Sequence, residues 1–448
     1  MEQVARYLQG NGIRRIRQAL VRMWVLARPP GTVRQWELAS GSAQVLRQRR
    51  EEFASQLRSG ADIDAEAIAA APLALIEALD LQIHEQENGA SIRSHRIAGA
   101  DAKFMRYRED GADYWLLPIS LTARARAATS HQVGSAAAWF RYNAVAPAKT
   151  AHGLNVHVQF GESRTQQIFE DLSLMQSGHL LAWIAHFNDG AMVERDLSIG
   201  DANRWRALAV QPHARRVESI QSTMESADRA GAHVVVLPEF AVDCEQRKSL
   251  TSILRSGASP GLALVVAGSF HETLGKRAFN TAPLLGANGR ELLKHCKLRL
   301  YGNRNGVAED VSAGDALHVL VTPLGSFAVL ICKDFMDAHL SVASLFQEVP
   351  VDWVLVPSFG DEKTLARHRA KADELARVAP GASSVVANTR NTALDPDGGP
   401  LWGFAQAAGA KATLEVGVDG GIVELPFETQ PRRPPTKPPG KPSLRRVK

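Results

Sequence analysis

The sequence predicts an α/β fold for its second half, and two patterns lead to this prediction. Between about residues 203 and 426, short apolar runs alternate with stretches in which apolar residues recur at helical spacing. The runs are almost continuously apolar, as expected for strands that are buried on both faces of a sheet. Strands that alternate with helices are typical of a layered α/β domain in which helices cover the sheet.

The elements of this domain can be placed in order along the chain. Six apolar runs are predicted to be strands: 207–210, 233–237, 262–268, 327–331, 353–356 and 384–387. Helical spacing links Val217, Ile220, Met224 and Ala227, and later Leu365, His368, Ala372 and Leu375 behind an acidic helix start at 361–362. Residues 281–295 are predicted to form a hairpin with Asn288-Gly289 as its turn.

Residues 1 to about 200 are predicted to be helical at first and then mixed α/β. Val21, Trp24 and Val25 form a short helical stripe, residues 65–81 are rich in Ala, Leu and Ile, and Pro29-Pro30-Gly31 interrupts the helical segments. Alternating residues at 113–118 and 154–160 indicate strands. This region contains no repeat and no catalytic signature, and its sequence indicates no function.

Composition limits the class of protein and its partners. A chain of 448 residues with 45% hydrophobic and 22% charged residues is expected to fold into two or three soluble domains. The net charge of +5 gathers at the ends, and residues 427–448 form a basic, proline-rich tail that is predicted to be disordered. No nucleic-acid-binding motif accompanies these charges, so nucleic acid is disfavoured as a partner.

The same composition favours a cytoplasmic protein. No run of eighteen apolar residues occurs, and the apolar stretch 19–27 is interrupted by Arg22, so neither a membrane span nor a signal peptide is predicted. Three cysteines, Cys244, Cys296 and Cys332, are expected to be free thiols in a reducing compartment. No HExxH or CxxC motif occurs and the fourteen histidines lack ligand spacing, so no metal or cofactor is predicted.

Three reactive residues fall at or near the ends of predicted strands. Glu239 follows the run 233–237, Cys332 follows 327–331, and Lys297 lies in the second arm of the hairpin. Ligands of layered α/β folds bind near such strand ends, so the three side chains are candidates for one site. Each residue also has a purely structural interpretation. Glu239 could be a solvated charge in a loop, Cys332 a small core residue, and Lys297 part of an edge strand protected by charge.

The order and surroundings of the three residues resemble the nitrilase superfamily. Residues 232–240 resemble the strand and Pro-Glu of its first motif, 297–301 its lysine motif, and 330–334 the turn that carries its nucleophile. Further matching segments are 267–270, 279–282, 354–358, 386–390 and Glu309 ahead of Gly314-Asp315. The resemblance covers about half of the chain.

The resemblance implies a four-layer αββα sandwich for residues 203–426 and a Glu-Lys-Cys triad. Cys332 would be the nucleophile, Glu239 the base and Lys297 the oxyanion lysine, with Glu309 and the backbone N–H of Lys333 in support. It also implies a small-molecule amide or nitrile substrate and a homodimer or larger homo-oligomer. The chain departs from the family at Lys333, where an aromatic residue is common, at residues 335–339, which replace Arg-Phe-Pro-Glu, and in its short last part.

These features predict a thiol hydrolase of non-peptide carbon–nitrogen bonds, amidase-like rather than a true nitrilase. One alternative is an N-acyltransferase that uses the same three residues and passes the acyl group to an amine. Another is a binding or effector protein, in which residues 1–200 sense a partner and the hydrolase domain serves as a regulated effector or scaffold. The sequence identifies the bond and leaves the substrate open.

Overall fold

The computed structural model describes residues 1–9, 12–89, 105–119, 139–140, 142–175, 177–187, 192–196, 204–257, 261–302, 307–378, 381–389, 402–417 and 420–428. The predicted disorder of the basic tail concerns residues that lie almost wholly outside these ranges. Among the described residues, no helix is long and apolar enough to cross a membrane.

The chain begins with helices, as predicted. They are α1 (Glu2–Leu8), α2 (Ile13–Ala27), α3 (Thr32–Ala39), α4 (Ala43–Ser59), α5 (Ala65–Ala70) and α6 (Pro72–Gly89). The Ser42 and Asp64 side chains cap α4 and α5 by accepting backbone N–H groups. Gly31, at φ 84°, separates α2 from α3, which confirms the predicted interruption. Apolar side chains of these helices form one buried cluster.

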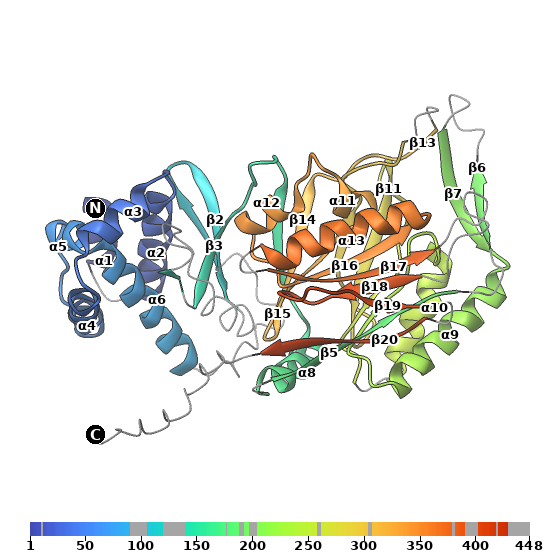
Figure 1. Cartoon of the computed structure of the whole chain (residues 1–448), viewed down its shortest axis with the longest axis horizontal. Helices are drawn as coiled ribbons and strands as arrows, with labels where there is room; N and C mark the ends of the chain where they lie inside the picture. Colours follow the sequence, from blue (N-terminus) through green and yellow to red (C-terminus); the bar gives the residue numbers. More distant parts are fainter. Residues whose placement is uncertain are drawn as a thin grey trace, which may run out of the picture.

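A three-stranded antiparallel sheet follows, with the order β1 (Arg106–Glu109), β2 (Ala112–Pro118) and β3 (Asn143–Pro147). Successive side chains of β2 point to opposite faces. Tyr114 and Leu116 join the cluster of the N-terminal helices, whereas Trp115 and Leu117 join a second cluster that includes Val156. The small sheet therefore lies between the helices and the rest of the molecule, as Figure 1 also shows.

The Trp115 indole reinforces this contact, because its Nε1 donates a hydrogen bond to Val156 O at 3.0 Å. We expect Trp115→Phe, which keeps an aromatic ring but loses the donor, to lower the free energy of unfolding by about 1–2 kcal/mol. Urea titration followed by circular dichroism measures this change. An unchanged unfolding midpoint would show that the contact contributes nothing to stability.

Two seven-stranded sheets form the main body. The first has the order β10-β11-β9-β8-β5-β20 with β12 paired to β11, and the second has the order β19-β18-β17-β16-β15-β14-β4. The strands of the first are β5 (Ser177–Ile184), β8 (Val234–Val236), β9 (Leu264–Val266), β10 (Phe270–Leu274), β11 (Arg277–Gly286), β12 (Glu291–Cys296) and β20 (Gly421–Glu428). Those of the second are β4 (Asn155–Phe160), β14 (Ala316–Thr322), β15 (Gly325–Val329), β16 (Trp353–Phe359), β17 (Ser383–Thr389), β18 (Gly403–Gln406) and β19 (Leu414–Val416).

Side chains from both sheets share one core. Val234, Val236 and Val266 of the first sheet belong to the same cluster as Phe327 and Leu355 of the second. The opposite side chains of the first sheet pack against α9 (His213–Arg229) and α10 (Cys244–Arg255). Those of the second sheet pack against α11 (Lys333–Met336), α12 (Val342–Glu348) and α13 (Glu362–Arg377). Burial on both faces explains why these strands read as continuous apolar runs.

The pairing extends this body toward the N-terminus. β4 pairs with β14 in parallel, and β5 pairs with both β8 and β20, while α8 (Ser163–Ser173) joins β4 to β5. The expected start at residue 203 is therefore too late for the sheets, and we infer a structural unit from about residue 155 to 428. Sequence reasoning missed this because partners such as 156 and 317 are far apart along the chain.

One predicted strand lies elsewhere. Residues 207–210 belong to β7 (Arg204–Gln211), which forms a separate sheet with β6 (Met192–Asp196) and β13 (Ala308–Glu309). Buried and exposed residues alternate along β7, and Leu208 is 51% exposed. The prediction of a strand is confirmed, but burial on both faces is wrong, because this sheet projects beyond the main body (Figure 1).

The predicted hairpin is confirmed as β11 and β12, which pair antiparallel. Its turn requires glycine at 289, where φ is 75° and a Cβ atom would lie 2.7 Å from Thr251 O on α10. The hairpin is therefore held directly against α10.

Candidate active site

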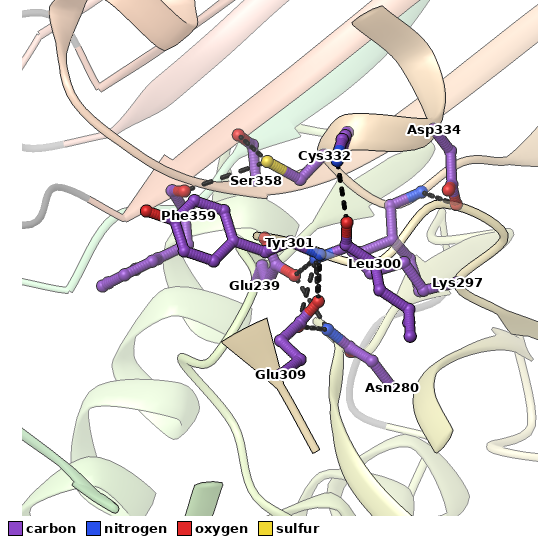
Figure 2. Close-up of polar contacts among 12 residues, drawn as sticks. Glu239, Asn280, Lys297, Leu300, Tyr301, Glu309, Cys332, Asp334, Ser358 and Phe359 are labelled. Atoms are coloured by element: carbon purple, nitrogen blue, oxygen red, sulfur yellow. Dashed lines mark hydrogen bonds and ion pairs between the residues drawn. The ribbon is translucent and has the colours of Figure 1, made fainter. Parts of the chain in front are cut away.

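Glu239 and Cys332 are brought together by adjacent residues of β16. The N–H of Glu239 donates to Ser358 O at 3.2 Å, and the N–H of Cys332 donates to Pro357 O at 2.9 Å. Glu239 follows β8 by three residues, and Cys332 follows β15 by three residues. The strand predicted at 327–331 therefore begins and ends two residues earlier than expected. Both side chains are buried, at 1% and 6% exposure. The ends of β8 and β15 thus bring a carboxylate and a thiol to the same site, where the two groups interact electrostatically (Figure 2).

Lys297 connects two buried carboxylates. It follows β12 directly, and its Nζ donates to Glu239 Oε1 at 2.9 Å and to Glu309 Oε1 at 3.1 Å. Glu309 lies at the end of β13, which pairs with β7. Burial by itself would lower the pKa of Lys297, but the two carboxylates outweigh it and raise this pKa. The Lys297 ammonium is therefore charged at neutral pH.

The two carboxylates differ in their proton affinity. Burial raises the pKa of Glu239, and the Glu309 charge adds to this effect although Lys297 opposes it. For Glu309, burial is outweighed by Lys297, by His271 and by the Tyr301 N–H at 2.7 Å, which together lower its pKa to about 2. Glu309 thus stays ionised at neutral pH and balances the charge of the Lys297 ammonium. Glu239 can gain and lose a proton without leaving the lysine unpaired.

Asn280 and His271 complete the cluster. Asn280 Nδ2 donates to Glu239 Oε1 at 2.8 Å and to Glu309 Oε1 at 3.0 Å. His271 Nδ1 accepts the N–H of Ala207 at 2.9 Å, so the imidazole proton lies on Nε2, which faces Glu309 Oε1 at 3.3 Å. Burial lowers the pKa of His271, and the neutral ring suits this arrangement.

Cys332 lies in a strained turn between β15 and α11, with φ 44° and ψ −100°. Left-handed backbone at a non-glycine residue is costly and is often found at functional sites. Its Sγ donates to Phe359 O at 3.8 Å and accepts from Ser358 Oγ at 3.5 Å. Burial raises the thiol pKa to about 12, with Glu239 raising it further and Lys297 opposing. Cys332 is therefore a neutral thiol at neutral pH, and it would need a base to become reactive.

Asp334 joins the lysine segment to the cysteine turn. Its Oδ1 accepts the N–H groups of Leu298 and Arg299 at 2.9 and 2.7 Å. Its Oδ2 accepts the N–H of Ile331 at 3.1 Å and lies 3.0 Å from His295 Nε2. One buried carboxylate thus positions the residues next to Lys297 and Cys332 together.

Lys333 neither points freely into solvent nor pairs with an acid in the described part of the chain. It is half-buried, and its Nζ donates to Leu300 O at 2.9 Å. Within the described ranges, no atom accepts a hydrogen bond from its backbone N–H. This N–H adjoins Cys332 and could donate to a ligand.

The depressed pKa of Glu309 predicts a pH dependence of stability. The folded value of about 2 lies below the value of about 4.3 for an unperturbed glutamate, so Glu309 contributes stability above that pH. This contribution is lost as the pH falls through about 4 toward 2. We expect Glu309→Gln to flatten this part of the stability profile, measured by urea unfolding at each pH. Glu218→Gln, an exposed site on α9, is the control, and parallel profiles for the wild type and Glu309→Gln would contradict the prediction.

The predicted site residues therefore lie at one place. Glu239, Lys297 and Glu309 are joined by hydrogen bonds, and Cys332 and Lys333 lie on the adjoining turn. Among the described residues, no group of three or more His, Cys, Asp or Glu side chains could hold a metal ion. The chemistry available is that of a thiol with a nearby base and a fixed cation.

Comparison with known proteins gives a consistent result. No family model matches the chain. Omega-amidase NIT2 of Danio rerio is 27% identical over 161 residues, which cover 31% of this chain and 58% of the relative. The match thus spans just over half the length of that relative.

Solved amidases from Nesterenkonia are also similar. One amidase is 21% identical with a TM-score of 0.39, covering 56% of this chain and 92% of the other. A variant with the acetamide moiety of fluoroacetamide covalently added at its active-site cysteine is 20% identical with the same TM-score and coverage. The match to the omega-amidase supports a nitrilase-superfamily domain in this chain, as the sequence motifs predicted.

Proposed function

We propose that this chain is an amidase-like thiol hydrolase of non-peptide carbon–nitrogen bonds. The observation that supports this most directly is Lys297, whose Nζ links Glu239 to Glu309 beside the strained turn of Cys332. A thiol, a base of raised pKa and a permanently charged ammonium are the groups that acyl transfer through a thioester requires. The similarity to an omega-amidase supports the same class of substrate bond.

In the first half-reaction, Cys332 Sγ attacks the amide carbon and its proton passes to Glu239. The negative charge that develops on the amide oxygen is stabilised by the Lys297 ammonium and the Lys333 N–H, each worth about 3–4 kcal/mol in comparable sites. When the carbon–nitrogen bond breaks, Glu239 returns the proton to the leaving amine. A thioester on Cys332 and free ammonia or amine result.

In the second half-reaction, Glu239 takes a proton from water, which attacks the thioester. The carbon–sulfur bond breaks, the acid leaves, and the proton returns to the Cys332 sulfur. Glu309 keeps Lys297 charged throughout, because its own low pKa leaves it ionised while Glu239 changes protonation state. Asn280 orients both carboxylates, so we assign it a positioning role.

The fold in this proposal is a four-layer αββα sandwich. The shared core of the two large sheets, and the clusters that join each sheet to its own helices, support this arrangement. We also propose a cytoplasmic enzyme that forms a homodimer or larger homo-oligomer. The three cysteines are free thiols, which suits a reducing compartment.

The test is to trap the acyl-enzyme. The full chain is mixed with a panel of small amides, quenched in acid and analysed by mass spectrometry. We expect a substrate-dependent mass increase on the peptide that contains Cys332, and faster decay of this adduct in wild type than in Glu239→Gln. Decay that accelerates with added amine would identify the acyltransferase alternative. An adduct on Cys244 or Cys296, or none with any amide, would contradict the proposal.

A further inference from the structure

A polar groove of about 800 Å³ lies on the outer side of the first large sheet, away from Cys332. Helix α10 forms one wall, through residues such as Cys244 and Thr251. The β11–β12 hairpin and its turn form the other wall, with Pro283 and Asn288. This volume is within the usual range of about 300–1,000 Å³ for small-molecule sites.

Cations dominate the lining. Five basic side chains and two carboxylates face the groove: Arg247, Lys248, Arg255, Arg290 and Lys294, against Glu272 and Glu291. Lys294 pairs with Glu272 at 3.1 Å and with Glu291 at 3.3 Å, and Arg247 lies 3.8 Å from Glu272. Lys248 pairs with Glu245 at 2.7 Å. The other cations therefore exceed the negative charge that the groove itself supplies.

Two of these cations have no acidic partner among the described residues. Arg255, at the end of α10, and Arg290, at the hairpin turn, are exposed and form no ion pair there. Arg247 is 8% exposed, and its two terminal nitrogens donate to Thr281 Oγ1 and Thr281 O at 3.1 and 2.7 Å. Its Nε is buried without a hydrogen-bond partner in the described ranges, so this guanidinium is incompletely satisfied.

The walls of the groove are held in place by close packing. At Gly289 an added Cβ atom would lie 2.7 Å from Thr251 O and 3.3 Å from Leu254 Cβ. The hairpin turn therefore rests against α10 and brings Arg290 to the same groove as Arg255. Arginines that are fixed from two separate elements can bind one anion from two sides.

The groove and the candidate active site lie on opposite faces of the same strands. His271 and Asn280 are paired across β10 and β11 and face the catalytic carboxylates. Their neighbours Glu272 and Thr281 point to the other face, where Thr281 Oγ1 donates to Glu272 Oε2 at 2.8 Å. Lys297 and Lys294 lie three residues apart and also face opposite sides: Lys297 contacts Glu239 in the candidate active site, and Lys294 contacts Glu272 in the groove. Each strand thus serves both sites.

We propose that this groove is a second binding site, for a small molecule that carries phosphoryl groups. A phosphoryl group presents several charged oxygens that match the planar forks of arginine, and its charge balances the unpaired cations. Because Arg247 holds Thr281, next to Asn280, an anion that recruits Arg247 would act on the strand that positions Glu239 and Glu309. The site is independent of the proposed reaction at Cys332.

Isothermal titration calorimetry of the full chain with inorganic pyrophosphate, at constant ionic strength, tests the proposal. We expect saturable binding by wild type and a Kd at least about 10-fold weaker in the double variant Arg255→Gln/Arg290→Gln, since two charge-assisted contacts are lost. The control is Arg215→Gln/Arg277→Gln, which removes the same charge from exposed sites outside the groove. No saturable binding by wild type, or equal weakening in both double variants, would overturn the proposal.

Alkylation supplies an independent readout. Cys244 lines the groove, whereas Cys296, also half-buried, does not. Pyrophosphate at saturation should slow the alkylation of Cys244 by N-ethylmaleimide and leave the rate at Cys296 unchanged. Equal rates at Cys244 with and without pyrophosphate would place the bound anion elsewhere and refute the assignment.

Discussion

Replacing Cys332 by alanine is expected to lower kcat for an amide substrate by about 10⁴- to 10⁶-fold, as for other enzymes that lose a covalent nucleophile. The physical reason is that the fixed ammonium and base remain, while the carbon–sulfur bond can no longer form. Because the thiol pKa is raised to about 12 by burial, its reactivity depends on proton transfer to Glu239. Glu239→Gln should therefore abolish turnover nearly as completely as the loss of the thiol.

The measurement is steady-state kinetics with an amide that acylates the wild-type enzyme. Cys296→Ala is the matched control, because this half-buried thiol is the last residue of β12, next to Lys297, and has no role in the proposed reaction. Full activity in Cys296→Ala with none in Cys332→Ala supports the assignment. Residual turnover above about one hundredth of wild type in Cys332→Ala would exclude a covalent mechanism at this residue.

Replacing Lys297 by methionine is expected to have the largest effect on stability. Its ammonium is the shared partner of two buried carboxylates, at 2.9 and 3.1 Å, and its side chain is 3% exposed. Without the ammonium, Glu239 and Glu309 must either stay ionised with no cation beside them or become protonated at neutral pH. Removing one partner of a buried ion pair typically costs about 3–5 kcal/mol, and we expect a loss of this size.

Urea unfolding of the full chain at pH 7 measures this loss. Lys294→Met is the control within the same hairpin, because Lys294 is half-buried and its ion pair with Glu272 is worth about 1 kcal/mol or less. The double variant Lys297→Met/Glu309→Gln should recover part of the stability, since one buried carboxylate is gone. A Lys297→Met protein as stable as Lys294→Met would refute the central electrostatic role of this lysine.

Local sequence patterns were sufficient to predict much of the site. Glu239 and Cys332 each follow an apolar run, and the Asn288-Gly289 turn defines the hairpin that carries Lys297. These features depend on residues that are neighbours along the chain. The burial of the strands could be predicted for the same reason, because a strand that is apolar at every position is expected to be buried on both faces.

Other parts of the site had no local signal for their role, although Asn280 lies in the segment 279–282 that resembles the superfamily. Asn280 and His271 act on the carboxylates through the register of β10 with β11, and Asp334 acts through contacts with residues more than thirty positions earlier. The local sequence does not distinguish a buried asparagine or aspartate from one in an exposed loop. Their roles follow from pairing across strands, which a single sequence does not specify.

The sequence by itself determined the α/β class of the second half and the helical start, and it supplied the nitrilase-like motifs and the candidate residues Glu239, Lys297 and Cys332. Only the tertiary structure decided that β4 and β5 belong to the large sheets and that β7 lies outside them. It also decided that Glu309 pairs with Lys297, and that a cationic groove lies behind the strands that carry the candidate site. The physical reason is that secondary structure and motifs reflect local residue patterns, whereas charge pairing and strand order depend on which distant segments share a buried space.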